Sequence, residues 1–531
     1  MYDIFIHGGL IVDGSGEKAF PANVGIEGEK ITYIGSEMRE AKKMLDAKGK
    51  LVTPGFIDAH SHGDINLGYE FQSIAKISQG ITTECAGNCG QAAFPVSEKY
   101  RNLYLQIAGA LIQKVDIDNI SAFTNADNFI KYSNQKDLYL NTAMAVGHGY
   151  IRLAVMGMEN RQPTSEELEE MKVYVKEAME RGAFGLSSGL IYPPGPYANA
   201  EELIELCKVV KEYNGMYITH MRNESDNVEE ALEEAIYIAE QAGVKLWISH
   251  HKTAGVNNFG KSRKTIAMIE AARKRGVEIG YDLYPYTAGL SFGHIVLAPR
   301  YMSQGLASLV DRMKDPDFRQ EAKADVLNPK EPYENMYLGC GGFEGIVPVS
   351  CPQTPEAAGI SIAEYAKNLG YEDPFDAYFD IMIKNKGGVM FCYFMMSFDD
   401  IDYLIQNDLA TIGTDGFITT PEEPCHPRAF GTFPFAINRF VKEKAYFTME
   451  EFIYKITKYT AEQFGLEKRG ELKEGYFADI VVMDPETIDA KADYSDSHAL
   501  SEGIDKVIIN GKIAYEDKHL TNERAGKLLM D

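Results

Sequence analysis

The sequence lacks any run of about 18 consecutive apolar residues, which is the length that a membrane-spanning helix needs. It also lacks an excess of basic residues, since 53 Lys and Arg stand against 78 Asp and Glu, giving a net charge of −25. Nucleic acids and anionic membranes would repel such a chain, so neither is expected as a partner. A small anionic molecule is still compatible with this charge, because a binding site can be locally positive.

Cysteine is scarce and irregularly placed. The chain has 7 cysteines, an odd number, and their spacing does not repeat. A disulfide framework is therefore not expected, and a reducing compartment is the simpler interpretation. The segment MYDIFIHGGLIVDG has neither a basic stretch nor a long apolar core, so it does not resemble a signal peptide. We expect a cytoplasmic protein, and the sequence does not indicate its oligomeric state.

The middle of the chain alternates short apolar segments with helical ones. Thr164 and Glu167 form a predicted capping box for one helix, which ends near Gly182. This alternation is typical of parallel α/β folds, and eight strands are the number in a (β/α)8 TIM barrel. A doubly wound sheet is the competitor, but no GxGxxG motif opens the chain. The eight predicted strands are FIDAH, ITTECAG, NTAMAVGHG, GAFGLSSG, GMYITH, KLWISH, VEIGYDLY and LATIGTDG.

Both ends of the chain differ from the middle. Residues 1–52 and 471–531 alternate apolar and polar residues and break at Gly, Asn-Gly and Asp-Pro, which predicts short strands. We expect these ends to form one small β-sandwich domain beside a barrel of residues 53–470. Residues from about 291 to 400 separate the seventh and eighth strands, which is too long for a simple crossover. We interpret this interval as an insertion with its own helices, lying over the barrel mouth as a lid.

Histidines and an aspartate occur where several predicted strands end. In GFIDAHSHGD, His60 and His62 are two residues apart and therefore point to the same side of a strand. GMYITH ends at His220, KLWISH ends at His250, and Asp415 follows LATIGT. Because barrel active sites lie at the carboxyl ends of the strands, these side chains are expected to meet at one rim. A lone histidine is usually structural, but this set at matching positions favours a shared site for a divalent cation.

Cys89 adds a thiol to the same rim. The motif GNCG places it just after the second predicted strand. Imidazole and carboxylate suit zinc, iron, cobalt or manganese, and a thiolate favours zinc. The alternative for Cys89 is a small buried hydrophobe, which is the usual fate of a free cysteine. The surrounding glycines favour an exposed turn instead, whereas Cys85, inside the strand, is expected in the core.

These segments resemble the amidohydrolase superfamily, whose members share His-x-His on strand one, histidines on strands five and six, and an aspartate on strand eight of the barrel. Within it, the sequence is more similar to the N-acyl-D-amino-acid deacylases (D-aminoacylases). The resemblance spans nearly the whole chain, and GNCG together with HMRNE and SHHK makes it specific. The matching stretches are PGFIDAHSHGD, QGITTECAGNCG, SSGLIYPPGPYA, ITHMRNE, ISHHK, YDLYPYTAG, TIGTDG, HPRAFGTFP and LKEGYFADIVVMDP.

The resemblance implies one tightly held zinc ion and a second, weaker zinc position. Many superfamily members bridge the two positions with a carboxylated lysine. The fourth predicted strand, GAFGLSSG, has no lysine, which is consistent with the thiolate of Cys89 taking that role. The implied ligands are Cys89, His220 and Asp415 for the tight position, and His60, His62 and His250 for the weaker one, with Cys89 able to bridge.

The implied activity is hydrolysis of the amide bond of an N-acyl-D-amino acid to a carboxylate and a free D-amino acid. Zinc would lower the pKa of bound water, and Asp415 would act as general base and then return the proton to the leaving nitrogen. By the same resemblance, Tyr192 would donate to the oxyanion, or alternatively pack its ring against the two prolines beside it. Lys252, Tyr284 and Arg428 would bind the carboxylate of a small-molecule substrate.

The chain departs from the family pattern at four positions. Leu290 stands where relatives often have Ser, Phe435 where they have Arg, and Glu84 and Cys85 where they have small apolar residues. These changes leave the predicted ligands intact, but they leave open the acyl group and the amino-acid side chain of the substrate. Two other functions stay open. One is hydrolysis of a cyclic amide, as in hydantoinase- or dihydroorotase-like relatives, which usually carry the bridging lysine. The other is a non-catalytic scaffold.

Overall fold

Eight parallel strands form the centre of the computed structural model, which describes residues 1–108, 117–417 and 420–531. Neighbouring strands pair in chain order. Ala145 lies between β10 and β11, and its backbone N–H donates to the carbonyl oxygen of Ala86 (2.9 Å). The backbone bond from Asp415 N to His60 O (2.9 Å) pairs the last strand with the first. The sheet therefore closes into the predicted barrel and is not an open doubly wound sheet. The strands are β8 (Phe56–Asp58), β9 (Ile81–Ala86), β10 (Asn141–Met144) with β11 (Val146–Gly147), β12 (Gly185–Gly189), β13 (Met216–His220), β14 (Lys245–Ile248), β15 (Ile279–Leu283) and β19 (Ala410–Ile412).

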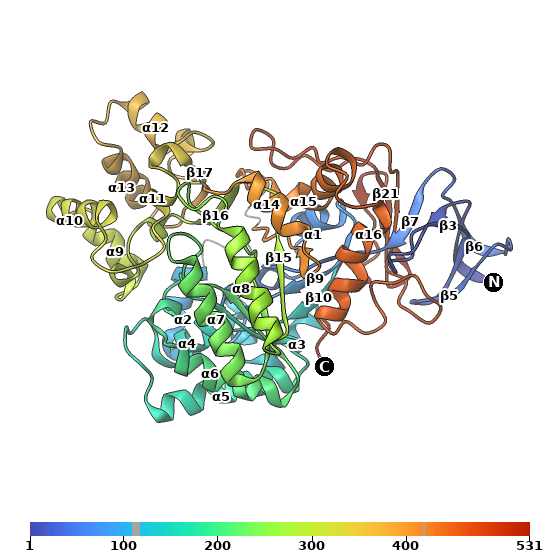
Figure 1. The fold of residues 1–531 in the computed structure, drawn as a ribbon, viewed down its shortest axis with the longest axis horizontal. Coiled ribbons are helices and arrows are strands. Elements are labelled where there is room, and N and C mark those ends of the chain that lie inside the picture. Colours follow the sequence, from blue (N-terminus) through green and yellow to red (C-terminus); the bar gives the residue numbers. More distant parts are fainter. Residues whose placement is uncertain (109–116, 418–419) are drawn as a thin grey trace.

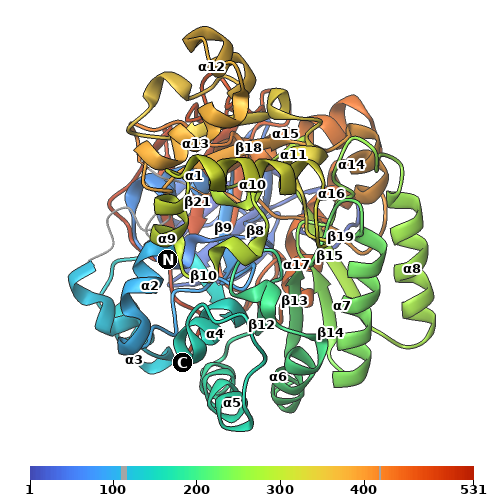
Figure 2. The ribbon, with the colours of Figure 1, turned by 90° about the vertical axis from the view of Figure 1, so that its left-hand side faces the viewer.

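Helices lie around the barrel (Figure 2). The predicted capping box is present at helix α5 (Ser165–Glu180), where Thr164 accepts from the N–H of Glu167 and the Glu167 side chain accepts from the N–H of Thr164. One face of this helix is buried through Met171 and Val175, whereas its opposite face carries glutamates. Strands such as β13 are buried along their whole length, as expected when helices cover a parallel sheet.

The two ends of the chain meet in two further sheets at one end of the molecule (Figure 1). β7 from the first part of the chain pairs antiparallel with β20 from the last part, with Val52 opposite Val482. Buried apolar residues of both sheets form one cluster. The first sheet has the order β5 (Lys30–Gly35), β4 (Asn23–Glu27), β1 (Tyr2–His7), β6 (Ala41–Asp46), and the second has the order β23 (His519–Leu520), β22 (Lys512–Glu516), β21 (Ile504–Ile509), β20 (Ile480–Met483), β7 (Leu51–Pro54), β2 (Leu10–Ile11), β3 (Phe20–Pro21).

The long interval between β15 and β19 folds at the other end of the molecule (Figure 1). It contains helices, as predicted, and also a small antiparallel sheet that the sequence did not indicate. It contacts the barrel loops, since Glu334 accepts from Glu224 N (3.1 Å) and Ser291 donates to the Tyr192 hydroxyl (3.4 Å). None of the described helices combines the length and apolarity needed to cross a membrane. Its strands are β16 (Ala288–Phe292), β17 (Ile346–Ser350) and β18 (Met390–Phe394), and its α-helices are α9 (Leu306–Arg312), α10 (Pro316–Leu327), α11 (Met336–Gly339), α12 (Ile362–Leu369), α13 (Pro374–Lys384) and α14 (Phe398–Ile405).

Candidate metal centre

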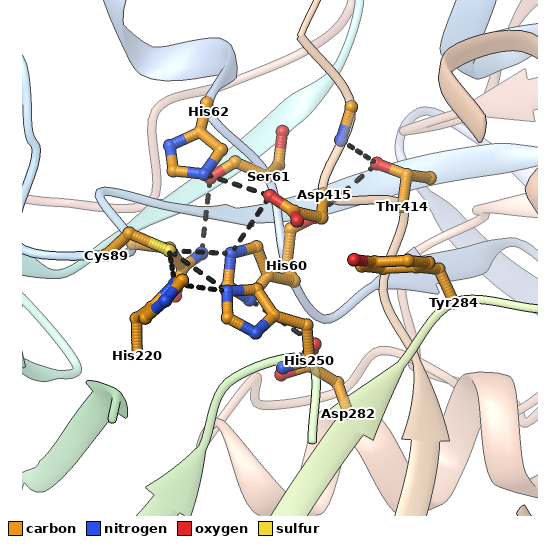
Figure 3. A network of polar contacts seen from close by, with 12 residues as sticks. His60, Ser61, His62, Cys89, His220, His250, Asp282, Tyr284, Thr414 and Asp415 are labelled. Carbon is orange, nitrogen blue, oxygen red and sulfur yellow. Dashed lines mark hydrogen bonds and ion pairs between the residues drawn. The ribbon is translucent and has the colours of Figure 1, made fainter. Parts of the chain in front are cut away.

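The six side chains that the sequence predicts as metal ligands lie together at the carboxyl ends of the barrel strands (Figure 3). Each ends a strand or follows one within a few residues, and all six are buried. They are His60 and His62 after β8, Cys89 after β9, His220 at the end of β13, His250 after β14 and Asp415 after β19.

Three of these residues have a left-handed backbone, which is uncommon outside glycine. The φ angles are 55° at Cys89, 36° at His250 and 46° at Asp415. Such conformations persist only where the surroundings hold them, and they concentrate at functional sites. The backbone therefore gives up local stability at these three strand ends in order to aim the side chains at a common point.

One group of donor atoms consists of a thiol and two imidazoles. The Cys89 Sγ atom lies 3.4 Å from His250 Nε2 and 3.8 Å from His220 Nδ1. The two imidazole nitrogens are 2.9 Å apart. Ligands about 2.0–2.3 Å from a tetrahedral zinc ion lie about 3–4 Å from one another, so these separations fit a single ion.

A second group shares Cys89 and adds the aspartate. Asp415 Oδ1 lies 3.3 Å from His62 Nε2 and 3.5 Å from His60 Nε2. Cys89 Sγ is 3.4 Å from His60 Nε2, so the thiol faces both groups.

The implied grouping of the ligands is corrected by these distances. The resemblance implied that Asp415 would lie with Cys89 and His220, and that His250 would lie with His60 and His62. In the structure, Asp415 lies with His60 and His62, and His250 lies with Cys89 and His220. The reason is barrel closure, which puts the eighth strand beside the first and the fifth beside the sixth.

Three of the four imidazoles and the carboxylate are in their metal-binding forms, whereas the charges of Asp282 and Asp415 outweigh burial and raise the pKa of His60. Burial lowers the pKa values of His220 and His250 well below their usual range and lowers that of His62 to about 4, so all three are neutral near pH 7. Burial opposes ionisation of Asp415, but the charge of Arg428, helped by the nearby histidines, holds its pKa well below the usual range. Burial raises the pKa of Cys89, so this thiol needs a cation to become a thiolate.

The flanking aspartates of GFIDAHSHGD, to which the sequence assigned no role, support the centre from behind. Asp64 accepts from Ala93 N (2.7 Å) and Gly87 N (3.4 Å), which holds the turn that carries Cys89. Asp58 contacts the segment that follows β19 by accepting from Thr414 N (2.7 Å). Their position beside the histidines was the one signal for this role, since supporting carboxylates around metal ligands are common.

Asp282 and Glu224 are two further supporting acids that the sequence did not reveal. Asp282 accepts from His250 N (2.8 Å) and Trp247 Nε1 (2.7 Å). Glu224 lies 3.1 Å from His250 Nδ1 and accepts from Lys252 Nζ (2.7 Å). Glu224 belongs to the quoted HMRNE stretch, so its motif was visible although its role was not.

The predicted substrate-binding residues surround the same centre. Lys252 Nζ lies 5.7 Å from the centroid of the Tyr284 ring, and the Arg428 guanidinium lies 4.5 Å from it. Arg428 is fully buried and its Nη2 atom is 2.9 Å from Asp415 Oδ2. Among the described residues, its Nε and Nη1 atoms have no hydrogen-bond partner. A buried cation with unused N–H groups beside a metal centre is suited to binding an anion.

Tyr192 and two of the departures from the family pattern also lie in this region. The Tyr192 ring packs edge-on against His220, with centroids 5.0 Å apart. Leu290 is buried in β16, and Phe435 stacks on Tyr286 at 5.0 Å. Both departures therefore place apolar side chains where relatives carry polar ones.

Comparisons with known proteins agree on one kind of relative. The model of the Amidohydrolase family matches residues 43–325 and 394–515. The D-aminoacylase of Alcaligenes xylosoxydans xylosoxydans is 32% identical, covering 99% of this chain and 97% of the relative. The N-acyl-D-glutamate deacylase of the same organism is 31% identical, covering 99% of this chain and 96% of the relative.

Solved structures show the same similarity. The N-acyl-D-glutamate deacylase from Bordetella bronchiseptica, complexed with zinc and a phosphonate inhibitor that mimics the tetrahedral intermediate, has a TM-score of 0.83 at 30% identity, covering 100% of both chains. A D-aminoacylase described with a binuclear metal centre has a TM-score of 0.81 at 30% identity, again over 100% of both chains. A D-hydantoinase, at 16% identity and a TM-score of 0.55 over 99% of this chain and 98% of that one, shares the fold alone.

Proposed function

This chain belongs to the amidohydrolase family, and from that premise we propose that it is a zinc-dependent N-acyl-D-amino-acid deacylase. The proposal is carried by one arrangement. A buried guanidinium with unused N–H groups lies beside a cluster of thiol, imidazole and carboxylate donors. The cluster can activate water next to an amide, and Arg428 can hold the carboxylate that an N-acyl amino acid carries.

Zinc is the metal that the donor set fits. Cys89, His220 and His250 would hold the tightly bound ion, and Cys89 would share a second, weaker position with His60, His62 and Asp415. β12, with the sequence GLSSG, carries no lysine that could become a bridging carbamate, and the Cys89 sulfur lies between the two groups. Bound zinc supplies Lewis acidity, which lowers the pKa of water and polarises an amide carbonyl.

The protein's own residues carry the proton and orient the substrate. Asp415 is held ionised by Arg428, so it can accept a proton from the attacking water. It then gives this proton to the leaving nitrogen, because an amine leaves poorly unless it is protonated. The Tyr192 hydroxyl has a pKa raised by burial well above its usual value, so it remains a hydrogen-bond donor for the developing oxyanion.

The substrate carboxylate would be bound on the other side of the centre. Arg428 offers Nε and Nη1, and the Tyr284 ring lies 4.5 Å from the Arg428 guanidinium and 5.7 Å from Lys252 Nζ. Burial raises the pKa of Tyr284 to about 12, which keeps its hydroxyl protonated as a donor. This local positive charge explains how a chain of net charge −25 can take an anionic substrate.

The surroundings of the centre fit a small-molecule hydrolase. The interval between β15 and β19 would act as a lid, because Glu334 and Ser291 contact loops that border the metal centre. The β sheets at the ends of the chain would form one supporting domain of residues 1–52 and 471–531. We place the enzyme in the cytoplasm, in line with its lack of a cysteine pattern for disulfides.

A hydrolysis screen tests this proposal. Purified protein is given N-acetyl and N-formyl amino acids of both hands, together with dipeptides and hydantoins. We expect hydrolysis of linear N-acyl-D-amino acids, a rate lower by about 100- to 10,000-fold in Asp415→Asn, and unchanged tightly bound zinc in that variant. Preference for the L-series, or ring opening of hydantoins as the main activity, would point to another member of the family. Near-normal turnover by Asp415→Asn would remove Asp415 from the role of general base.

A further inference from the structure

A buried ammonium group lies directly behind the metal centre. Lys76 of helix α1 (Glu70–Ile77) is 1% exposed, and its Nζ atom donates to Thr414 Oγ1 (2.6 Å), Ser61 Oγ (3.1 Å) and the carboxylate of Asp58. Asp58 is fully buried and ends β8. Lys76 therefore joins the first barrel strand to the segment that follows the eighth, which are the two places that deliver His60, His62 and Asp415.

On one side, this contact holds the backbone around Asp415. Thr414 donates to Asp58 through both its N–H (2.7 Å to Oδ1) and its hydroxyl (2.7 Å to Oδ2), and its hydroxyl accepts from Gly416 N (3.1 Å). Lys76 and Asp58, which together we call the hub, therefore hold the residues before and after Asp415. Asp415 needs such support because its backbone is left-handed, with a φ of 46°.

On the other side, the same hub holds the turn that carries the two histidines. Asp58 Oδ1 also accepts from His60 N (3.2 Å). Ser61, whose hydroxyl accepts from Lys76, also accepts from Gly63 N (3.1 Å), so the residues flanking His62 are fixed as well.

Glu84 extends the hub to a third strand. This residue, one of the departures from the family pattern, lies in β9, where Glu84 Oε2 accepts from Ser61 Oγ (2.6 Å) and is 3.9 Å from Lys76 Nζ. Glu84 Oε1 accepts from Thr142 Oγ1 (3.2 Å). Two buried acids therefore share a single buried lysine, and no neutral side chain could replace the ammonium without leaving Asp58 as an unpaired buried charge.

We propose that Lys76 is a positioning residue which, acting through Asp58, Thr414 and Ser61, sets the Asp415 carboxylate against His60 and His62. The ammonium makes no contact with the Cys89–His220–His250 group, so that group should be independent of it. Its effect on turnover rests on the proposed function, whereas its effect on the second metal position does not.

Two variants and one matched control test the proposal. Lys76→Met removes the hub, and Asp58→Asn/Lys76→Met also removes the buried negative charge that would otherwise be stranded. The control is Lys455→Met, because Lys455 is another buried lysine (6% exposed), and its Nζ atom donates to the carbonyls of Asn407 (2.8 Å) and Ala410 (3.2 Å) near the start of β19. Zinc binding is measured by equilibrium dialysis over a range of free zinc, kcat and KM are measured with an N-acetyl-D-amino acid, and stability is measured by urea unfolding.

For Lys76→Met we expect one zinc ion retained as in the wild type, at least tenfold weaker binding of the second, and kcat at least tenfold lower with KM changed less than threefold. The double variant should regain stability but not kcat or the second zinc affinity. Lys455→Met should lose stability alone. Recovery of kcat in step with stability, a loss confined to KM, or unchanged second-zinc affinity in Lys76→Met would each overturn the proposal. A wild-type protein without deacylase activity would refute the proposed function, and the zinc measurements would still decide the role of Lys76.

Discussion

Arg428 gives the sharpest prediction about substrate binding. Its guanidinium is fully buried, makes one ion pair with Asp415, and keeps Nε and Nη1 without partners among the described residues. If these groups bind the substrate carboxylate, Arg428→Met leaves that carboxylate without a partner in a buried site. Truncating one member of a buried, hydrogen-bonded charge pair weakens binding by about 2–5 kcal/mol. At about 1.4 kcal/mol per factor of ten, kcat/KM for an N-acetyl-D-amino acid should fall by about 30-fold to several thousand-fold.

The assay must separate this effect from the loss of the Asp415 ion pair. Each variant is therefore measured with an N-acetyl-D-amino acid and with its neutral carboxamide. Any disturbance of Asp415 slows both substrates, whereas loss of carboxylate binding slows the acid alone. The ratio of the two kcat/KM values should collapse toward one in Arg428→Met. Arg428→Lys should be intermediate, because an ammonium keeps the charge but not the planar donor array.

Arg152 provides a matched control. It is also fully buried and is paired with Glu202, but it belongs to no part of the metal centre. Arg152→Met should lower stability while leaving the ratio of acid to carboxamide unchanged. Equal losses for the acid and the carboxamide in Arg428→Met would refute the assignment of Arg428 to the substrate carboxylate.

Three other predictions follow from named contacts. Cys89→Ala should lose zinc on dialysis, because Cys89 belongs to both donor groups. The control Cys85→Ala, four residues earlier in β9, should keep its zinc. Equal zinc content in the two variants would remove Cys89 from the ligands. Gly189→Ala should also weaken zinc retention, because a Cβ atom there would lie 2.0 Å from the Cys89 carbonyl oxygen and would displace the turn that carries Cys89. Gly388→Ala is the control, because the nearest atom to a Cβ there is 3.5 Å away. Metal analysis of the two variants distinguishes the effects. Burial lowers the pKa of His294 to about 4, below its unfolded value of about 6.5, so the unfolded chain takes up the proton first as the pH falls and the free energy of unfolding drops by about 3 kcal/mol between pH 6.5 and 4. Urea unfolding against pH should show this extra slope in the wild type relative to His294→Asn, and identical slopes would contradict it.

The barrel could be predicted from the sequence because strand and helix patterns alternate along the middle of the chain. Eight apolar segments with helical stretches between several of them are compatible with only a few architectures, and all eight form barrel strands. The antiparallel sheet β16–β18–β17 was not readable, because its strands lie far apart in the sequence and pair only through the fold of the insertion. Local patterns identify segments, but they do not say which distant segments pair.

The sequence by itself determined which side chains would meet at the rim of the barrel. Parallel strands all end at the same rim, so His60, His220 and Asp415 were placed by counting to the ends of their strands. The tertiary structure alone decided how the ligands are divided between the two groups, because closure of the barrel makes neighbours of its first and last strands. It also decided that Lys76, on a helix outside the barrel, places its ammonium against the hydroxyl of Thr414, the residue before Asp415. A lysine at that point of the sequence reads as an ordinary helical residue, since nothing local to it records the strand ends that it joins.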